Sequence, residues 1–220
     1  MSGIRNKVVT INNSSFQKLN CKKIIEYMKK YISILCLLTG IFMLYAFNPV
    51  KDDVFRVDTE KSIINWSAKK VGGGHTGTVK ISEGSLIYSG KALKGGSFLM
   101  DMASITSDNA RVTTHLKSDD FFSSAKNPNS KFEISKVSAA GKDRVTISGN
   151  LSIKGITHPL TFQATVKQQK NIIVAVANGI RIDRTKYDIK FRSKTFFGDI
   201  GDRAIDDEFE LSINLTAVKN

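Results

Sequence analysis

The densest group of potentially reactive side chains in this sequence lies at residues 115–120, where the chain reads HLKSDD and continues with two phenylalanines. His115 stands close to Asp119 and Asp120, a combination that can act as an acid–base cluster. Ser118 could serve as a nucleophile beside them, but the G-x-S-x-G turn that presents such a serine in many hydrolases does not accompany it. The simpler interpretation is that Ser118 and Asp119 cap a helix end while His115 helps to cover the core. We therefore assign no catalytic residue and keep a periplasmic hydrolase as an alternative.

Zinc binding is the second chemistry that the residue types suggest. His75, His115 and His158 are 40 and 43 residues apart, whereas catalytic zinc sites often take two histidines one helical turn apart, as in H-E-x-x-H. The two cysteines, Cys21 and Cys36, both precede residue 48. We therefore predict no metal site, no cofactor and no disulfide framework in the later part of the chain.

An apolar run near the N-terminus bears on the compartment. Residues 31–47 read YISILCLLTGIFMLYAF and directly follow Met28-Lys29-Lys30, which together have the organisation of a secretory signal peptide. We expect translation to begin at Met28, residues 1–27 to be an upstream extension of the gene, and residues 28–47 to be removed on export. The alternative is an uncleaved anchor formed by residues 31–47, since these 17 residues lie at the lower limit for a spanning helix. The predicted domain at 48–220 would then be periplasmic or secreted in a bacterium, or anchored by this run.

The charge pattern argues against nucleic-acid binding. Residues 1–47 hold seven of the 33 basic and one of the 20 acidic residues, which leaves 26 basic and 19 acidic residues after the leader. These are scattered singly, even in the densest cluster from Arg181 to Lys194. Nucleic-acid binding needs a continuous basic face, usually with stacking aromatics. We expect no nucleic-acid partner, while contact with an anionic membrane surface stays open.

The remainder of the chain is dominated by predicted strands. Apolar and polar residues alternate at 145–154, 160–167 and 209–217, as in antiparallel strands with one buried face. Weaker patterns predict strands at 55–58, 62–70, 76–82, 85–88 and 91–102. Glu83-Gly84 predicts a turn, and Gly155 a tight hairpin between two later strands. One short helix is expected at about 108–117, capped by Ser107 or Asp108.

The 173 residues after position 47 suit one domain with a sizeable core. About eight strands can bury their apolar faces in a two-sheet sandwich or in a closed barrel, which has room for one small ligand. The inward faces carry Gly149, Ala164, Met100 and Met102, and methionines adapt to irregular apolar ligands. The plain alternative is that these residues fill a dry core, and periodicity does not decide between the two.

Several short motifs follow one another in this stretch, namely GHTG at 74–77, MASI at 102–105, HLKSDDFF at 115–122, residues 128–132 and GNLSIKGITHP at 149–159. Together they resemble the YceI-like family of exported polyisoprenoid-binding proteins, over about residues 55–218. The resemblance implies an all-β fold, an extended eight-stranded antiparallel β-barrel of the lipocalin-like kind with one short helix near 108–117. It also implies a non-enzymatic protein whose lumen holds an isoprenoid lipid, such as a polyprenyl quinone or a polyprenyl phosphate. Homodimers are common in the family, and carriage, storage and stress response all stay open.

An isoprenoid chain offers only apolar surface, worth about 25 cal/mol per Å² buried, so its site needs apolar walls and no catalytic group. The wall candidates are apolar residues of the predicted inward faces and of the helix corner: Trp66, Phe98, Met100, Phe121, Phe122, Phe132, Ile147, Leu151, Phe162 and Phe209. Each can equally be plain core. His75, Lys117 and Arg184 are candidates for a polar or anionic headgroup, with a surface hydrogen bond or ion pair as the alternative. The other functional hypothesis is an envelope interaction protein that binds no lipid.

One position departs from the family pattern. Members commonly carry a glycine after an aromatic residue in an R-x-D-[FY]-G segment, whereas this chain reads RTKYD at 184–188, with Asp188 where the glycine would fall. The long segment that follows contains Phe196 and Phe197. We expect it to be a lid over the barrel mouth or a distinct headgroup contact, so that the ligand could differ from the usual one.

Overall fold

The computed structural model describes residues 22–33 and 51–220. Residues 22–33 form an exposed helix within a first unit, Met1–Pro49, while the described strands all belong to a second unit, Val50–Asn220. Among the described residues, no helix is both long enough and apolar enough to cross a bilayer. The predicted extension at 1–27 and leader at 28–47 lie mostly outside the described residues, so both stay predictions.

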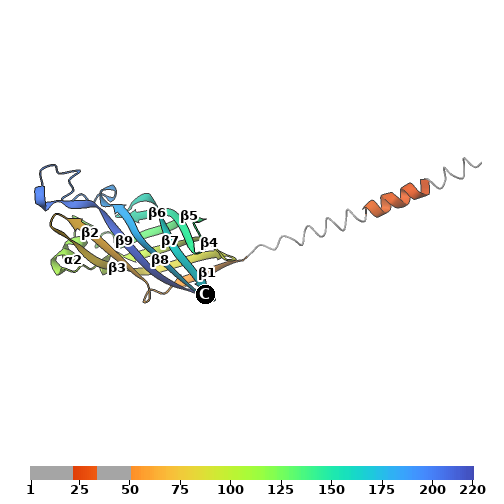
Figure 1. Ribbon diagram of the computed structural model, residues 1–220, viewed down its shortest axis with the longest axis horizontal. Helices are drawn as coiled ribbons and strands as arrows, with labels where there is room; N and C mark the ends of the chain where they lie inside the picture. Colours follow the sequence, from red (N-terminus) through yellow and green to blue (C-terminus); the bar gives the residue numbers. More distant parts are fainter. Residues whose placement is uncertain (1–21, 34–50) are drawn as a thin grey trace, which may run out of the picture. The chain divides into compact units, whose positions relative to one another are not determined.

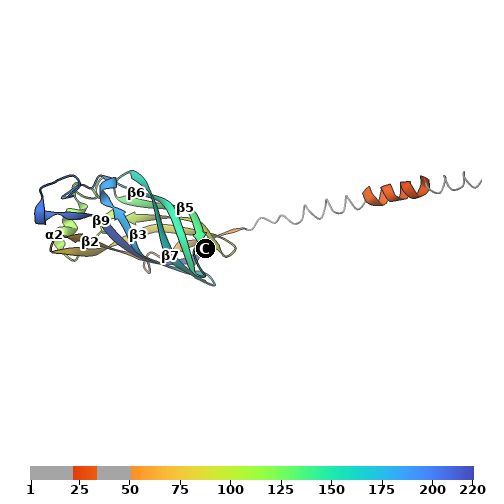
Figure 2. The same cartoon turned by 45° about the horizontal axis from the view of Figure 1, so that its top comes forward.

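The second unit is a single antiparallel sheet that curls into a barrel (Figures 1 and 2). Its strands are β1 Asp52–Val57, β2 Ile63–Lys70, β3 Gly73–Ser89, β4 Ala92–Asp101, β5 Asn129–Ala139, β6 Arg144–Ile153, β7 Ile156–Gln169, β8 Ile172–Asp183 and β9 Ile205–Lys219. The barrel has eight positions because β1 and β2 share one: both pair with β3 on one side and with β9 on the other. The predicted eight-stranded antiparallel barrel is therefore confirmed, and closure leaves no open sheet edge between these strands.

The break between β1 and β2 is bridged by Ser62. Thr216 of β9 faces this break, and its backbone oxygen accepts hydrogen bonds from Asp58 N and from Ser62 Oγ. The backbone N–H of Thr216 donates back to Ser62 Oγ at 3.0 Å. Both backbone groups of Thr216 thus have a partner at the break, as buried backbone groups require.

The two ends of the barrel differ. At the hairpin end, short turns join β3 to β4, β5 to β6 and β7 to β8, and the C-terminus lies there in both views (Figures 1 and 2). The helix end carries the two longest connections. One contains η1 (Met102–Ser104) and α2 (Ala110–Lys117), and the other contains η2 (Arg184–Tyr187) and η3 (Gly201–Arg203). The helix end is thus covered by chain, whereas the hairpin end is framed by turns.

The predicted hairpin at Gly155 is confirmed. Ile153 of β6 pairs with Ile156 of β7, and the two intervening residues, Lys154 and Gly155, have φ angles of 51° and 76°. Two successive positive φ angles are the signature of a type I′ turn, whose twist matches that of the strands it joins.

Two local predictions were wrong. Glu83-Gly84 forms no turn, because β3 continues through it with a bulge where Glu83 pairs with Leu99. A Cβ at Gly84 would lie 2.7 Å from Val57 and 2.8 Å from Phe98, so the glycine allows a close approach of side chains inside the barrel. The cap of α2 is Asn109 rather than Ser107 or Asp108, and its side chain accepts hydrogen bonds from Arg111 N and Val112 N. Both errors arise because the same residue types serve turns, caps and close packing.

Candidate functional site

The barrel lumen contains two neighbouring apolar cavities. One, of about 110 Å³, lies toward the helix end, and the other, of about 90 Å³, lies toward the hairpin end. We call them the helix-end cavity and the hairpin-end cavity. Their exposed walls are almost wholly apolar, because strand alternation sends every second side chain into the lumen.

Four residues line both cavities: Ile64, Met100, Leu151 and Leu211. They come from β2, β4, β6 and β9, which are spread around the barrel, so they form a divider across the lumen. Each cavity alone is smaller than the roughly 300–1,000 Å³ typical of small-molecule pockets. A long ligand would have to push this divider apart, and Met100 is the member with the most adaptable side chain.

The structure brings all ten predicted wall residues to the two cavities. Trp66, Phe121, Phe122 and Phe209 line the helix-end cavity, Phe98, Phe132, Ile147 and Phe162 line the hairpin-end cavity, and Met100 and Leu151 line both. Contact with a ligand stays a prediction for each of them.

A buried hydroxyl in the wall was missed by sequence reasoning. Ser130 of β5 lies opposite Met100, is 4% exposed and lines the helix-end cavity, and its Oγ has no hydrogen-bond partner among the described residues. The signal was available, because Ser130 precedes the inward-facing Phe132 and Ile134 at a spacing of two. A serine at such a position is polar, so the sequence pattern does not mark it as part of an apolar wall.

Replacing Ser130 tests whether its buried hydroxyl lacks a hydrogen-bond partner in the protein. We expect Ser130→Ala to raise the free energy of unfolding by about 1 kcal/mol, because a buried hydroxyl without a partner costs about that much or more. Ser62→Ala is the matched control. Ser62 is similarly buried, at 6% exposed, but its Oγ has two hydrogen-bond partners on Thr216. This variant should lower the free energy of unfolding by about 1 kcal/mol. Urea unfolding of both variants measures the difference. A loss of stability in Ser130→Ala would show that the hydroxyl is satisfied.

Arg184 is buried and fully engaged. It is 4% exposed, and its guanidinium donates to the backbone oxygens of Asp206, Ile189, Phe191 and Ile205 at 2.8–3.0 Å, and to the Asp207 carboxylate at 3.4 Å. Burial lowers the pKa of Arg184, and the charge of Asp207 works against that shift. All five N–H groups thus have protein partners, so no donor is left over for the headgroup contact predicted from the sequence. Instead, Arg184 ties the segment 189–207 across the helix end.

The departure at Asp188 has a structural explanation. Asp188 follows η2 with φ 56° and ψ 32°, in the left-handed region. Glycine adopts this conformation without a steric penalty, and aspartate is among the residues that tolerate it best. The position therefore has a backbone reason to favour glycine in relatives. Here Asp188 also forms a 2.7 Å ion pair with Lys190.

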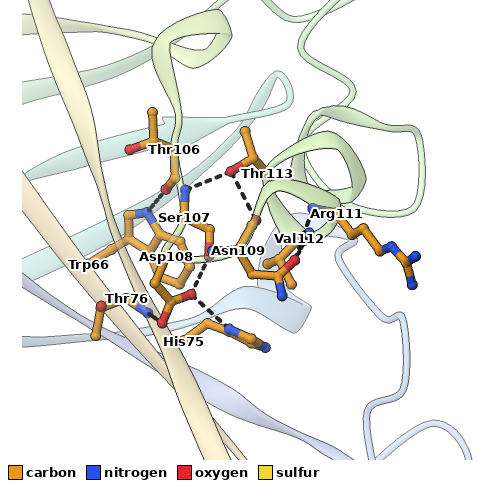
Figure 3. Close-up of polar contacts among 10 residues, drawn as sticks. All are labelled: Trp66, His75, Thr76, Thr106, Ser107, Asp108, Asn109, Arg111, Val112 and Thr113. Atoms are coloured by element: carbon orange, nitrogen blue, oxygen red, sulfur yellow. Dashed lines mark hydrogen bonds and ion pairs between the residues drawn. The ribbon is translucent and has the colours of Figure 1, made fainter.

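His75 takes part in a polar network that attaches the start of α2 to the barrel (Figure 3). Its Nδ1 lies 2.9 Å from Asp108 Oδ1, and the other carboxylate oxygen accepts from Thr76 N at 3.3 Å. The bond to His75 is the main reason why the pKa of Asp108 is lowered. A ring nitrogen of His75 is therefore already used within the protein, and the side chain lies beside a surface groove rather than in either cavity.

Trp66 extends the same attachment into the lumen wall (Figure 3). Its Nε1 donates to Thr106 O at 3.0 Å, while its ring lines the helix-end cavity. Gly77, which pairs with Trp66, leaves room for this contact, because a Cβ there would collide with the same Thr106 oxygen. The GHTG motif thus has a packing role at its second glycine.

The HLKSDDFF corner is held by local contacts. His115 Nε2 lies 2.9 Å from Asp120 Oδ2, and its ring packs edge-on against Phe121 and Phe191. Ser118 Oγ donates to the backbone oxygen of His115 at 2.7 Å, as expected of a residue that caps the helix end. His115, Ser118 and Asp120 thus each have a partner within the corner. Lys117 contributes its backbone oxygen to the corner, accepting from Ser124 N, and lines neither lumen cavity.

Asp119, the remaining acidic residue of the corner, pairs with Lys126 at 2.6 Å and accepts from Ser123 Oγ. The Lys126 bond is the main cause that lowers its pKa. The Nε2 of His158, the third histidine, lies 3.0 Å from the backbone oxygen of Lys186. Within residues 22–33 and 51–220, no three potential ligand side chains gather as they would around a metal ion.

Comparisons with known proteins support the sequence resemblance. The profile of the YceI-like domain matches residues 55–217. A UPF0312 protein of Pseudomonas paraeruginosa is 36% identical over 90 residues, which cover 34% of this chain and 47% of the relative. Another, from Pseudomonas fluorescens, is 28% identical over 143 residues, covering 63% of this chain and 73% of the relative. For several relatives the match spans only 47–60% of their length.

Solved structures show the same fold at low identity. BcnA of Burkholderia cenocepacia superposes with a TM-score of 0.64 at 21% identity, covering 74% of this chain and 99% of BcnA. A domain from Saccharophagus degradans, described as a polyisoprenoid binding domain implicated in plant cell wall breakdown, gives 0.59 at 14% identity, with 76% and 98% covered. At these identities the likeness concerns the fold alone.

Proposed function

The chain belongs to the YceI-like family, and we propose that it holds a long isoprenoid lipid, of the polyprenyl quinone or polyprenyl phosphate class, in its barrel lumen. The observation that carries the proposal is the pair of neighbouring apolar cavities in the lumen, which share four lining residues, Ile64, Met100, Leu151 and Leu211. The Saccharophagus degradans domain, whose description names polyisoprenoid binding, has the same fold and lends further support.

The physical basis of binding would be burial of apolar area. Each isoprene unit contributes apolar surface worth about 25 cal/mol per Å² removed from water. Because the walls are almost wholly apolar, few polar groups lose their hydration when the ligand binds. Entry of the chain would require the divider side chains to change rotamer, which a core made of methionine, leucine and isoleucine can do more readily than one of aromatic residues. The site needs no group that reacts.

Mass spectrometry of a solvent extract tests the proposal directly. The protein is purified from its native host without added detergent and extracted, and the lipid-to-protein ratio is measured. We expect a polyprenyl lipid at close to one per barrel. A protein that is folded by circular dichroism but yields no lipid would contradict the proposal and favour an envelope interaction protein.

We further propose that the domain is exported, on the basis of the run at 31–47 and the two lysines before it. N-terminal sequencing of the protein isolated from the native host should begin near Phe47 or Asn48. Mature protein that still contains residues 1–27 would contradict this proposal, whereas a chain starting at Met28 would favour the anchor alternative.

A further inference from the structure

A basic groove opens at the hairpin end of the barrel. It has a volume of about 750 Å³ and is framed by the turns between β3 and β4, β5 and β6, and β7 and β8. Five cationic residues and one acidic residue, Asp143, line it; the cations are Lys91, Lys94, Lys142, Arg144 and Lys170. We call these five the cationic rim.

The rim gathers like charges that come from three separate hairpins. In the described part of the chain none of the five forms an ion pair with a carboxylate. Like charges held close together repel one another and raise the local positive potential, which attracts an anion. All five are exposed, so this attraction should weaken as salt is added.

The floor of the groove leads toward the lumen. Leu93 and Val166 line both the groove and the hairpin-end cavity, so the groove and the apolar interior adjoin at these two side chains. Tyr88 also lines the groove, and burial raises its pKa to about 12. Like any tyrosine hydroxyl it is protonated at physiological pH, and it can donate a hydrogen bond to an anion.

The helix end offers a weaker case for an anionic group. Its surface groove, of about 320 Å³, has three cations, Lys70, Arg192 and Arg203, against Asp202. The two histidines there are already paired with Asp108 and Asp120. The segment that Arg184 holds also covers this end. In the described part of the chain, the hairpin end is thus the more positive of the two ends, and short turns frame it.

We infer that the lumen ligand is an anionic amphiphile whose phosphate-type headgroup sits in the cationic rim while its tail passes between Leu93 and Val166 into the hairpin-end cavity. The inference rests on the proposed function and selects the phosphate over the quinone class. The headgroup then stays in water at the rim, where its charge keeps partial hydration, and only the tail is buried.

Titration of the delipidated full chain with farnesyl phosphate and with farnesol tests this, because the two probes share a tail and differ in the headgroup. We expect farnesyl phosphate to bind about tenfold more tightly at low salt, since several charge-assisted contacts are gained. The double variant Lys94→Gln/Arg144→Gln should lose most of that advantage and leave farnesol binding unchanged. Lys80→Gln/Lys136→Gln is the matched control, because it removes two exposed charges on strands that lie outside the groove.

The other outcomes separate the two proposals. If both probes bind equally and the rim variant changes neither, the headgroup assignment is overturned while lipid binding stands. If neither probe binds, the proposed function fails first. If inorganic phosphate binds the rim but does not compete with farnesyl phosphate, the inference is overturned. The inference would also be overturned if the protein bound anionic phosphatidylglycerol vesicles only with an intact rim while the two probes bound equally. The rim would then be a membrane contact.

Discussion

Leu151→Trp should reduce lipid occupancy at least about tenfold while the barrel stays folded. Leu151 lines both lumen cavities as part of the divider, so a larger ring there occupies the passage that a continuous chain must use. The cavities of about 110 and 90 Å³ on either side give the indole room. Overpacking should therefore cost no more than about 1–3 kcal/mol of stability. The measurement is the lipid-to-protein ratio in solvent extracts of the variant and the parent.

The matched control for this variant lies on the same strand. Asn150 is the exposed neighbour of Leu151 on β6, so Asn150→Trp introduces the same ring on the outer face, and occupancy should not change. Phe162→Trp, on the wall of the hairpin-end cavity alone, should reduce occupancy less than Leu151→Trp. Full occupancy in a folded Leu151→Trp protein would count against a continuous lumen site.

Arg184→Met should lower the free energy of unfolding by about 3–5 kcal/mol, the range seen when one partner of a buried charged network is removed. Methionine keeps much of the length and apolar contact of arginine but leaves four backbone oxygens of the segment 189–207 without their donor. Arg184→Lys should recover little of the loss, because an ammonium group cannot reproduce the planar fork of donors. Urea unfolding curves with equal slopes would report the change.

Arg181→Met controls for the loss of a positive charge. Arg181 lies near the end of β8, shortly before Arg184 in the chain, and is exposed, so its replacement should change stability by no more than about 0.5 kcal/mol. A loss below about 1 kcal/mol in Arg184→Met would show that water replaces the guanidinium, contrary to the burial of the site. The same outcome would contradict the role of Arg184 in holding the segment 189–207 across the helix end.

The strands and the lumen walls were predictable because both depend on local periodicity. Inward residues recur every second position along a strand, so Phe162, Ile147 and Leu151 could be placed on the inward faces of their strands from the alternation alone. The choice of a barrel lumen over a sandwich core depended on the family resemblance. The turn assigned to Glu83-Gly84 shows where this fails, since a glycine serving a close approach to Val57 and Phe98 looks the same in sequence as a glycine in a turn.

What the amino-acid sequence determined by itself is the family, the barrel of antiparallel strands and the apolar character of the interior. The tertiary structure alone decided how polar groups are used. It paired Arg184 with carbonyls up to 22 positions away, left Ser130 without a partner, and collected Lys91, Arg144 and Lys170 at one end. The reason is physical: alternation is a property of neighbouring residues, whereas hydrogen-bond partners and charge clusters depend on strand register and barrel closure, which join segments far apart in the chain.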